Sequence, residues 1–142
     1  MSKKIKVEND VLGEMHRHAL SDFPNECVGF FYGSITGEEK IVSEYQPLEN
    51  SKEGDQRRRF EVHPLDYMKA EKYALENNLD LLGIYHSHPL HPAIPSVHDL
   101  KQAVPFFSYI IVSVNERTVE DTTSWQLNEE NTEFEKEILI NN

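Results

Sequence analysis

The stretch IYHSHPLHPAIPSVHD, residues 84–99, gathers histidine and aspartate at the end of an apolar run. His86 and His88 are two residues apart, so on a β-strand both side chains leave the same face. Two imidazoles on one face can bind a single metal ion, and a catalytic zinc site adds a third protein ligand and a water. Asp99 is the candidate third ligand, because the proline-rich residues 89–95 are long enough to fold back and stiff enough to hold the return.

Helix capping and loop composition offer a simpler interpretation of part of this stretch. Ser96 and Asp99 match the S-x-x-D capping pattern, so the start of a helix alone could account for both residues. An isolated H-x-H is weak evidence for a metal. His91 and His98 have no spacing that directs them to such a site, and we expect a loop residue and a helix-surface residue, respectively.

One further acid, Glu26, directly precedes the short apolar segment 27–33. A carboxylate beside the start of a buried strand is costly unless it has a partner or takes part in chemistry. Glu26 could therefore be a general base, whereas composition alone favours an exposed loop acid. Its neighbour Cys27 is the single cysteine, which excludes an internal disulfide and fits a reducing cytoplasm. For Cys27 itself we expect a small buried residue.

The helices and strands that must position these residues follow from hydrophobic spacing. A first helix begins at Asn9 or Asp10, ends before Pro24 and has an apolar stripe of Val11, Leu12, Met15 and Ala19. A second begins at Pro64, runs to about Asn78 and has an apolar side of Leu65, Met68, Ala74 and Leu75. A third, short helix lies within 95–104. Strands are expected at 27–33, 40–48, 57–62, 79–85, 108–114, 119–127 and 134–140.

This order of elements predicts the fold class: a single α/β domain spanning residues 1–142, with a mixed β-sheet flanked by helices. Segment 79–85 is a continuous apolar run, as expected of a central strand covered on both faces. Segment 134–140 alternates and is expected to close the sheet as an edge strand. Gly37 lies in the turn SITGE, where a hairpin calls for a positive φ.

Composition narrows the classes of function. The chain has 142 residues, 38% hydrophobic and 27% charged, which indicates a globular domain. Its formal net charge of −11 argues against nucleic-acid binding, and the one basic cluster, residues 57–59, is flanked by acids. No apolar run is long enough to cross a membrane, and the basic N-terminus lacks the apolar core of a signal peptide. We therefore expect a cytoplasmic protein without a membrane partner.

Three motifs together resemble the JAMM metalloproteases, the MPN-domain family that carries a catalytic motif. They are NECVGFFYG (25–33), GIYHSHP (83–89) and PSVHD (95–99). The family motif is a glutamate followed by H-x-H-x7-S-x2-D, and its positions here are Glu26, His86, His88, Ser96 and Asp99. The resemblance covers nearly the whole chain and looks like the short stand-alone prokaryotic members. It implies a curved mixed sheet between helices, similar to cytidine deaminases.

The resemblance also implies a role for each motif residue. His86, His88 and Asp99 would bind one zinc ion per chain. Glu26 would take a proton from the attacking water and return it to the leaving amine. Ser96 would hydrogen-bond the oxyanion or the water. The implied activity is that of a zinc-dependent metallopeptidase or isopeptidase.

A substrate class is implied as well. Short prokaryotic relatives act on ubiquitin-like sulfur carriers and remove a residue or peptide joined to the carrier's C-terminal glycine. The chain shows no inserted loops of the kind that eukaryotic deubiquitinases use to hold ubiquitin, so polyubiquitin is a poor expectation. The oligomeric state stays open.

Three other classes of function compete with this one. Two histidines and one carboxylate also describe the site of a non-haem iron oxygenase. Many MPN domains are non-catalytic protein-interaction modules, although those usually lose metal ligands and none is lost here. A zinc deaminase is disfavoured, because its H-x-E and P-C-x-x-C signature is absent.

Overall fold

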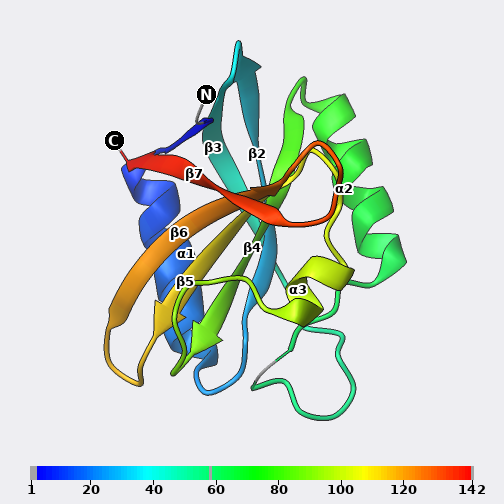
Figure 1. Ribbon diagram of the computed structural model, residues 1–142. Coiled ribbons are helices and arrows are strands. Elements are labelled where there is room, and N and C mark those ends of the chain that lie inside the picture. Colours follow the sequence, from blue (N-terminus) through cyan, green and yellow to red (C-terminus); the bar gives the residue numbers. More distant parts are fainter. Residues whose placement is uncertain (1–2, 58, 142) are drawn as a thin grey trace.

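A computed structural model describes residues 3–57 and 59–141 of the chain (Figure 1). Within these two ranges, seven strands form one closed sheet in the spatial order β1-β3-β2-β4-β5-β6-β7. The strands are β1 (Lys4–Val7), β2 (Val28–Thr36), β3 (Glu39–Leu48), β4 (Asp80–Pro89), β5 (Ser108–Val114), β6 (Val119–Leu127) and β7 (Phe134–Asn141). The helices are α1 (Asn9–Asp22), α2 (Pro64–Glu76) and α3 (Val97–Lys101). The predicted single α/β domain with a mixed sheet is therefore confirmed in its class.

Closure of the sheet depends on a strand that hydrophobic spacing did not predict. β1 pairs in parallel with β3 on one side and with β7 on the other. Ile5 and Val7 alternate with lysines in this short strand, and both are fully buried. The expectation of an edge strand at 134–140 is wrong, because β7 pairs with β6 through its first half and with β1 through its second. Closure thus leaves β7 with a neighbour on each side.

The central strands carry a helix on each face (Figure 1). The expected stripe of α1 is buried against alternate residues of β5, among them Ile110 and Val112. Ala70 and Ala74 of α2 pack on the opposite face, against residues such as Phe30 and Ile84. β4 is therefore covered on both sides, as its continuous apolar run predicts. Among the described helices, none has the length and apolar character needed to cross a membrane.

The apolar side predicted for α2 is only partly correct. Ala74 is buried, but Leu65, Met68 and Leu75 are exposed. Successive helical residues turn by about 100°, so these three larger side chains lie away from the Ala70–Ala74 stripe. The helix packs through its small residues and places its larger apolar ones outward. Its start is as predicted, with Pro64 at the first helical position.

The strand predicted at 57–62 is wrong. Residues 59–63 have no regular structure, and Arg58 of the basic cluster lies outside the described residues. Phe60 is nevertheless buried. Phe60 belongs to the hydrophobic cluster that includes Ala70 of α2 and Ile84 of β4, and its ring also lies against a histidine ring on β4. Its burial therefore comes from packing and not from a place in the sheet, which explains why this segment resembles a strand in the sequence.

Substitutions at two glycines test the close packing of β4 against β5: one lies at that contact, and the other, in α1, is a control. A Cβ at Gly83 would collide with the Ser108 carbonyl oxygen and lie 2.8 Å from the ring of Phe31, whereas Gly13 in α1 has open space around it. We expect Gly83→Ala to lower the free energy of unfolding by about 1–3 kcal/mol or more. Gly13→Ala should raise it by roughly 0.5–1 kcal/mol, because alanine favours the helix interior. Urea unfolding of both variants measures this, and a neutral Gly83→Ala would contradict the β4–β5 packing.

Candidate metal centre

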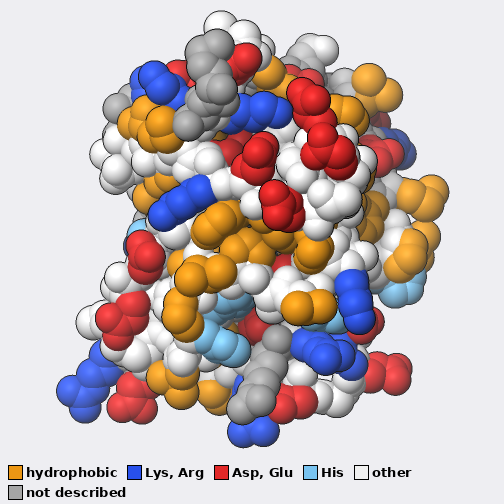
Figure 2. All heavy atoms as spheres, viewed as in Figure 1, with side chains coloured by type: hydrophobic (Ala, Val, Ile, Leu, Met, Phe, Trp, Pro, Cys, Tyr) orange, Lys and Arg blue, Asp and Glu red, His pale blue; other side chains and the backbone are white. Residues whose placement is uncertain are grey.

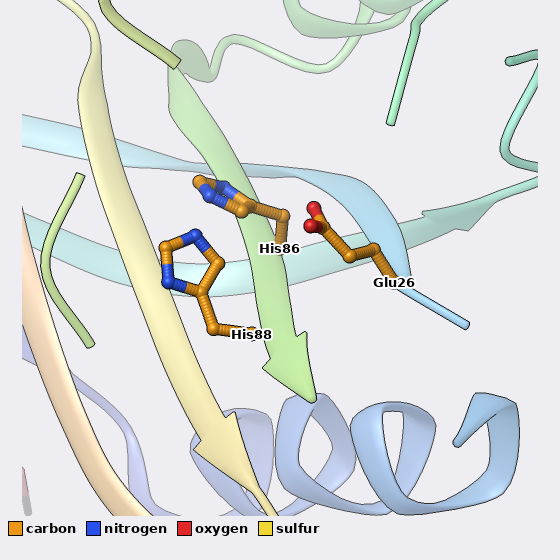
Figure 3. A group of neighbouring side chains, drawn as sticks. All are labelled: Glu26, His86 and His88. Atoms are coloured by element: carbon orange, nitrogen blue, oxygen red, sulfur yellow. The ribbon is translucent and has the colours of Figure 1, made fainter. Parts of the chain in front are cut away.

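The two histidines of the H-x-H motif lie at the carboxyl end of β4. Both side chains leave the same face of the strand, and Figure 3 shows them side by side with the carboxylate of Glu26 directed toward them. His86 is fully buried and His88 is 4% exposed. The strand period explains the shared face, and the parallel neighbour β5 fixes the register of this end through pairs such as His86 with Ile111. The predicted convergence of the two imidazoles is therefore present.

Asp99 reaches the same point from α3. Its Oδ2 lies 3.2 Å from His88 Nε2 and 3.4 Å from His86 Nε2. On the other side of its ring, His88 Nδ1 lies 2.8 Å from the Pro92 carbonyl oxygen. A carbonyl only accepts, so Nδ1 carries a proton, and Nε2 is the ring nitrogen that faces Asp99. An imidazole nitrogen and a carboxylate oxygen directed at one point are suited to share a metal ion.

Glu26 lies just before β2 and adds a second acid to the pair of histidines. Glu26, His86 and His88 each offer a ligand atom, and these atoms lie within 4.8 Å of one another. Glu26 is 2% exposed, and its Oε1 has no hydrogen-bond partner among the described residues. Neither do the two ring nitrogens of His86, apart from the proximity of Asp99. Buried acceptors that lack donors fit a site for a cation, and two histidines with a carboxylate suit zinc.

The two acids have opposite electrostatic environments. Burial disfavours ionisation of Asp99, but the nearby His86, the ring of His88 and the backbone N–H of Ser96 outweigh it and hold the pKa of Asp99 well below its usual value. Burial raises the pKa of Glu26 to about 9, and the charge of Asp99 adds to the shift. Asp99 is therefore a permanent anion and Glu26 a carrier of a proton at neutral pH. Burial also lowers the pKa of His86, which keeps its ring neutral and able to bind a cation.

Ser96 and Asp99 form a complete capping box at the start of α3. Ser96 Oγ accepts from the Asp99 N–H (3.0 Å), and Asp99 Oδ2 accepts from the Ser96 N–H (2.8 Å). The capping box thus starts the helix and also places Asp99 beside the histidines. Ser96 is exposed, and because its oxygen accepts here, its hydroxyl proton is left to donate to another group.

The position of Glu26 relative to the histidines depends on Ser87, which the sequence reasoning missed. Ser87 lies between the two histidines and points to the other face of β4. Its Oγ accepts from the Cys27 N–H (2.8 Å), and its own N–H donates to the Cys27 carbonyl (3.2 Å). Alternation along H-S-H is the signal that could have indicated a serine on the far face.

The loop that returns the chain to Asp99 is held by hydroxyl groups of the sheet. Ser113 Oγ donates to the His91 carbonyl, and Thr123 Oγ1 donates to the Ala93 carbonyl (2.6 Å). The Leu90 N–H donates to the Val114 carbonyl (2.8 Å). Together with the prolines, these bonds fix the segment that carries the Pro92 carbonyl and so the ring of His88.

Three neighbouring residues differ in how well they were predicted. His91 lies in the loop after β4, as expected, with its ring centroid 5.4 Å from that of His88. The expectation of a surface residue is wrong for His98, which is half-buried with its Nε2 closed off from solvent and unpartnered among the described residues. The buried Cys27 is confirmed, and burial raises the pKa of its thiol to about 12, so it is unreactive.

The surroundings of the centre are apolar on one side and open on the other. The ring of Phe60 lies over His86 with a centroid distance of 4.5 Å. Figure 2 shows histidine and acidic side chains together in the lower half of one face, with hydrophobic side chains around them. A pocket of about 650 Å³ lies between Phe23 and Pro24, the charged pair Asp55 and Arg57, and residues 89–91. An extended chain could approach the centre from this side.

Comparisons with known proteins agree with this geometry. A sequence model described as prokaryotic homologs of the JAB domain matches residues 8–128. The chain is 36% identical over 105 residues to a Thermus thermophilus protein named probable TtuB-protein conjugate cleaving protease, covering 74% of this chain and 67% of that protein. It is 36% identical over 81 residues to a Pyrococcus furiosus protein named desampylase, covering 57% of this chain and 56% of that protein. The matches thus span about two thirds and little more than half of these relatives.

Two solved structures share the fold over almost the whole chain. A solution structure of a Desulfitobacterium hafniense protein has a TM-score of 0.84 and 28% identity, covering 97% of this chain and 92% of that one. A solution structure of a Salinibacter ruber protein has a TM-score of 0.73 and 36% identity, covering 96% and 91%. The expected likeness to cytidine deaminases and the extension of one such domain over all of 1–142 stay predictions.

Metal content tests the proposed ligand set. We expect purified protein to hold about one zinc per chain, and His86→Ala, His88→Ala and Asp99→Asn to lose most of it, because each removes a buried ligand. His63→Ala is the matched control, since His63 is exposed and its ring caps α2 by accepting from the Leu65 N–H. Elemental analysis after exhaustive buffer exchange measures the zinc. Full retention in both His86→Ala and His88→Ala would rule out this site.

Proposed function

This chain belongs to the prokaryotic JAB domain family, and from that premise we propose that it is a zinc-dependent metallopeptidase. It would hydrolyse the amide bond after the C-terminal glycine of a ubiquitin-like sulfur carrier. The observation that carries the proposal is a buried pair of histidines shared by two acids, one held ionised and one holding a proton. Two acids whose pKa values are pushed apart by their environments are suited to different roles in one reaction.

His86, His88 and Asp99 would hold the zinc. Asp99 suits a ligand, because it stays ionised and lies within 3.4 Å of both Nε2 atoms. The Pro92 carbonyl supports the set by fixing the tautomer of His88, as outer partners of metal-binding histidines commonly do. When bound, zinc acts as a Lewis acid that polarises the scissile carbonyl and lowers the pKa of water toward about 7.

Glu26 would move the proton that hydrolysis requires. Adding water across the amide gives a hydroxyl to the carbonyl carbon and a hydrogen to the nitrogen. A carboxyl that already holds a proton cannot accept one, so Glu26 would act from its ionised form, which a cation bound beside it favours. It would then take the proton from the attacking water and return it to the leaving amine. Its raised pKa supports the second half of this role, because a carboxylate with a high proton affinity holds the proton until the amine leaves.

Ser96 would donate its hydroxyl proton to the oxygen that gains negative charge. Its oxygen already accepts from the Asp99 N–H, so the hydroxyl is oriented by the helix cap without being consumed by it. A donor held in place before the reaction stabilises charge with little reorganisation.

The choice of substrate rests on the name of a relative and on the pocket that lies beside the buried centre. The name of the Thermus relative gives a protein conjugate as what that enzyme cleaves, which supports a bond between a carrier tail and an amine. Glycine residues lack side chains, so a Gly-Gly tail can pass close to the buried centre. The 650 Å³ pocket beside Pro24, two residues before Glu26, would receive the leaving group, since Glu26 must reach its nitrogen.

The two alternatives make different predictions. A non-haem iron oxygenase would bind iron and consume oxygen in the assay, whereas a peptidase would do neither. A non-catalytic interaction module would have no use for a buried Glu26 whose Oε1 lacks a partner in the described part of the chain, because such a group costs stability. Elemental analysis and an oxygen electrode separate the first alternative from the proposal.

Glu26→Gln separates metal binding from catalysis. The change keeps the size of the side chain and removes the group that carries the proton, so zinc should be retained and cleavage should fall by about 10²–10⁴-fold. Ser96→Ala should lose less. The assay follows by intact mass a sulfur carrier from the same genome that bears one extra C-terminal residue.

The control for this variant is Glu129→Gln, an exposed acid in the β6–β7 turn, which should cleave like the wild type. Cleavage blocked by a chelator would support the proposal. An active Glu26→Gln protein would remove Glu26 from the mechanism. If no carrier is cleaved while unrelated peptides are, the protein is a general peptidase.

A further inference from the structure

The backbone of Glu26 is held by a loop that no motif includes. The Glu26 N–H donates to the Gln56 carbonyl (2.7 Å), and the Glu26 carbonyl accepts from Asn50 Nδ2 (3.2 Å). Both partners lie in the irregular segment between β3 and α2. Glu26 itself precedes β2, which begins at Val28, so the sheet ladder does not fix it.

Asn50 is the residue that organises this loop. Its Nδ2 donates also to the Arg59 carbonyl (3.0 Å), and its Oδ1 accepts from the Lys52 N–H (3.0 Å) and the Glu61 N–H (3.1 Å). All the hydrogen-bonding capacity of one amide is used to join both ends of the loop to Glu26. Gln56 adds to the same closed arrangement, because its Nε2 donates to the Asn50 carbonyl (3.0 Å).

The side chain of Glu26 has no comparable support. Its Oε1 is buried and unpartnered among the described residues, so no hydrogen bond to that atom fixes where the carboxylate points. The direction of the side chain therefore depends on how the backbone is held at two points. Asn50 donates to the carbonyl of Glu26 itself, and Ser87 accepts from the N–H of the next residue, Cys27. Ser87 belongs to β4 and moves with the histidines, whereas the loop is an independent element.

We propose that Asn50 is a positioning residue for Glu26. It acts through its bond to the Glu26 carbonyl and through the backbone of Gln56, and it touches no reacting atom. This rests on the proposed function, in which Glu26 carries the proton. A displacement of about 1 Å of a catalytic group can cost on the order of 10²-fold in rate. Release of the Glu26 carbonyl should therefore lower kcat while the zinc ligands, which Asn50 does not contact, stay in place.

Asn128 provides a matched control. It too is half-buried, its Oδ1 accepts from the backbone N–H groups of Thr132 and Glu133, and its Nδ2 donates to Thr132 Oγ1. It organises the β6–β7 turn and makes none of its hydrogen bonds to Glu26. Changing either asparagine to aspartate keeps the acceptor oxygen, removes the donor and adds one negative charge, so the two variants differ in place and not in chemistry.

The first test is a double-mutant cycle between Asn50 and Glu26 on carrier cleavage. Asn50→Asp and Asn50→Ala should lower kcat by roughly tenfold to a hundredfold with KM and zinc content unchanged. In the Glu26→Gln background the same changes should cost almost nothing further, because residues that act through one group are non-additive. Asn128→Asp should leave kcat unchanged. Equal losses in both backgrounds, or loss of zinc, would show a merely structural role and overturn the proposal.

The second test needs no activity. Exchange of the Glu26 amide hydrogen, measured by NMR in the zinc-loaded protein, reports its bond to Gln56. It should accelerate at least roughly tenfold in Asn50→Asp, while amides of the buried strand β5, such as that of Ile110, keep their rates. If the wild type cleaves no carrier, the proposed function fails but this test still stands. Unchanged exchange at Glu26 in both Asn50 variants would contradict the positioning role.

Discussion

The centre of this protein depends on the burial of polar groups that no hydrogen-bond partner among the described residues satisfies. His86 and Glu26 place ring nitrogens and a carboxylate oxygen in the interior without partners among the described residues. Each buried unpaired polar group costs about 1–3 kcal/mol, and a charged one costs more. Glu26 avoids part of that cost by holding a proton, which its pKa of about 9 expresses. A cation among these groups would remove the cost for the carboxylate and for the nitrogen of His86 that carries a lone pair.

The rest of the fold can be understood as the framework that keeps these groups together. Strand β4 presents both histidines on one face, and pairing with its parallel neighbour β5 fixes the register of that part of the strand. The loop after β4 returns the chain so that the cap of α3 sets Asp99 beside them, and Pro92 orients His88 on the way. On the other side, Ser87 and the Asn50 loop hold the backbone at Glu26. The segments that carry the centre are thus joined largely by hydrogen bonds between a side chain of one and the backbone of another.

Periodicity and motif spacing predicted the elements that carry the metal centre better than the strand that closes the sheet. The helical stripe of α1, the buried strand β4 and the cap at Ser96 all follow from local patterns, so they were predictable. Strand β1 was missed because four residues are too few to show a period. Phe60 suggested a strand because it is buried by packing against residues distant in the sequence, and not by sheet pairing. Asn50 left no signal at all, since one polar residue in a polar loop looks like any other until the fold brings it to Glu26. Burial was wrongly predicted for Leu65, Met68 and Leu75, because α2 packs on the sheet through its alanines and leaves these larger side chains exposed.

The count of protons released when zinc binds tests this account most directly. Titration of zinc into metal-free protein near pH 7.5, in buffers of different ionisation enthalpy, gives that count calorimetrically, because metal binding to protonated groups releases their protons. Glu26 is protonated at this pH without metal and should ionise beside the cation. The wild type should therefore release roughly one proton more per zinc than Glu26→Gln. Equal counts in the two proteins would mean that Glu26 does not face the metal, and would contradict the account.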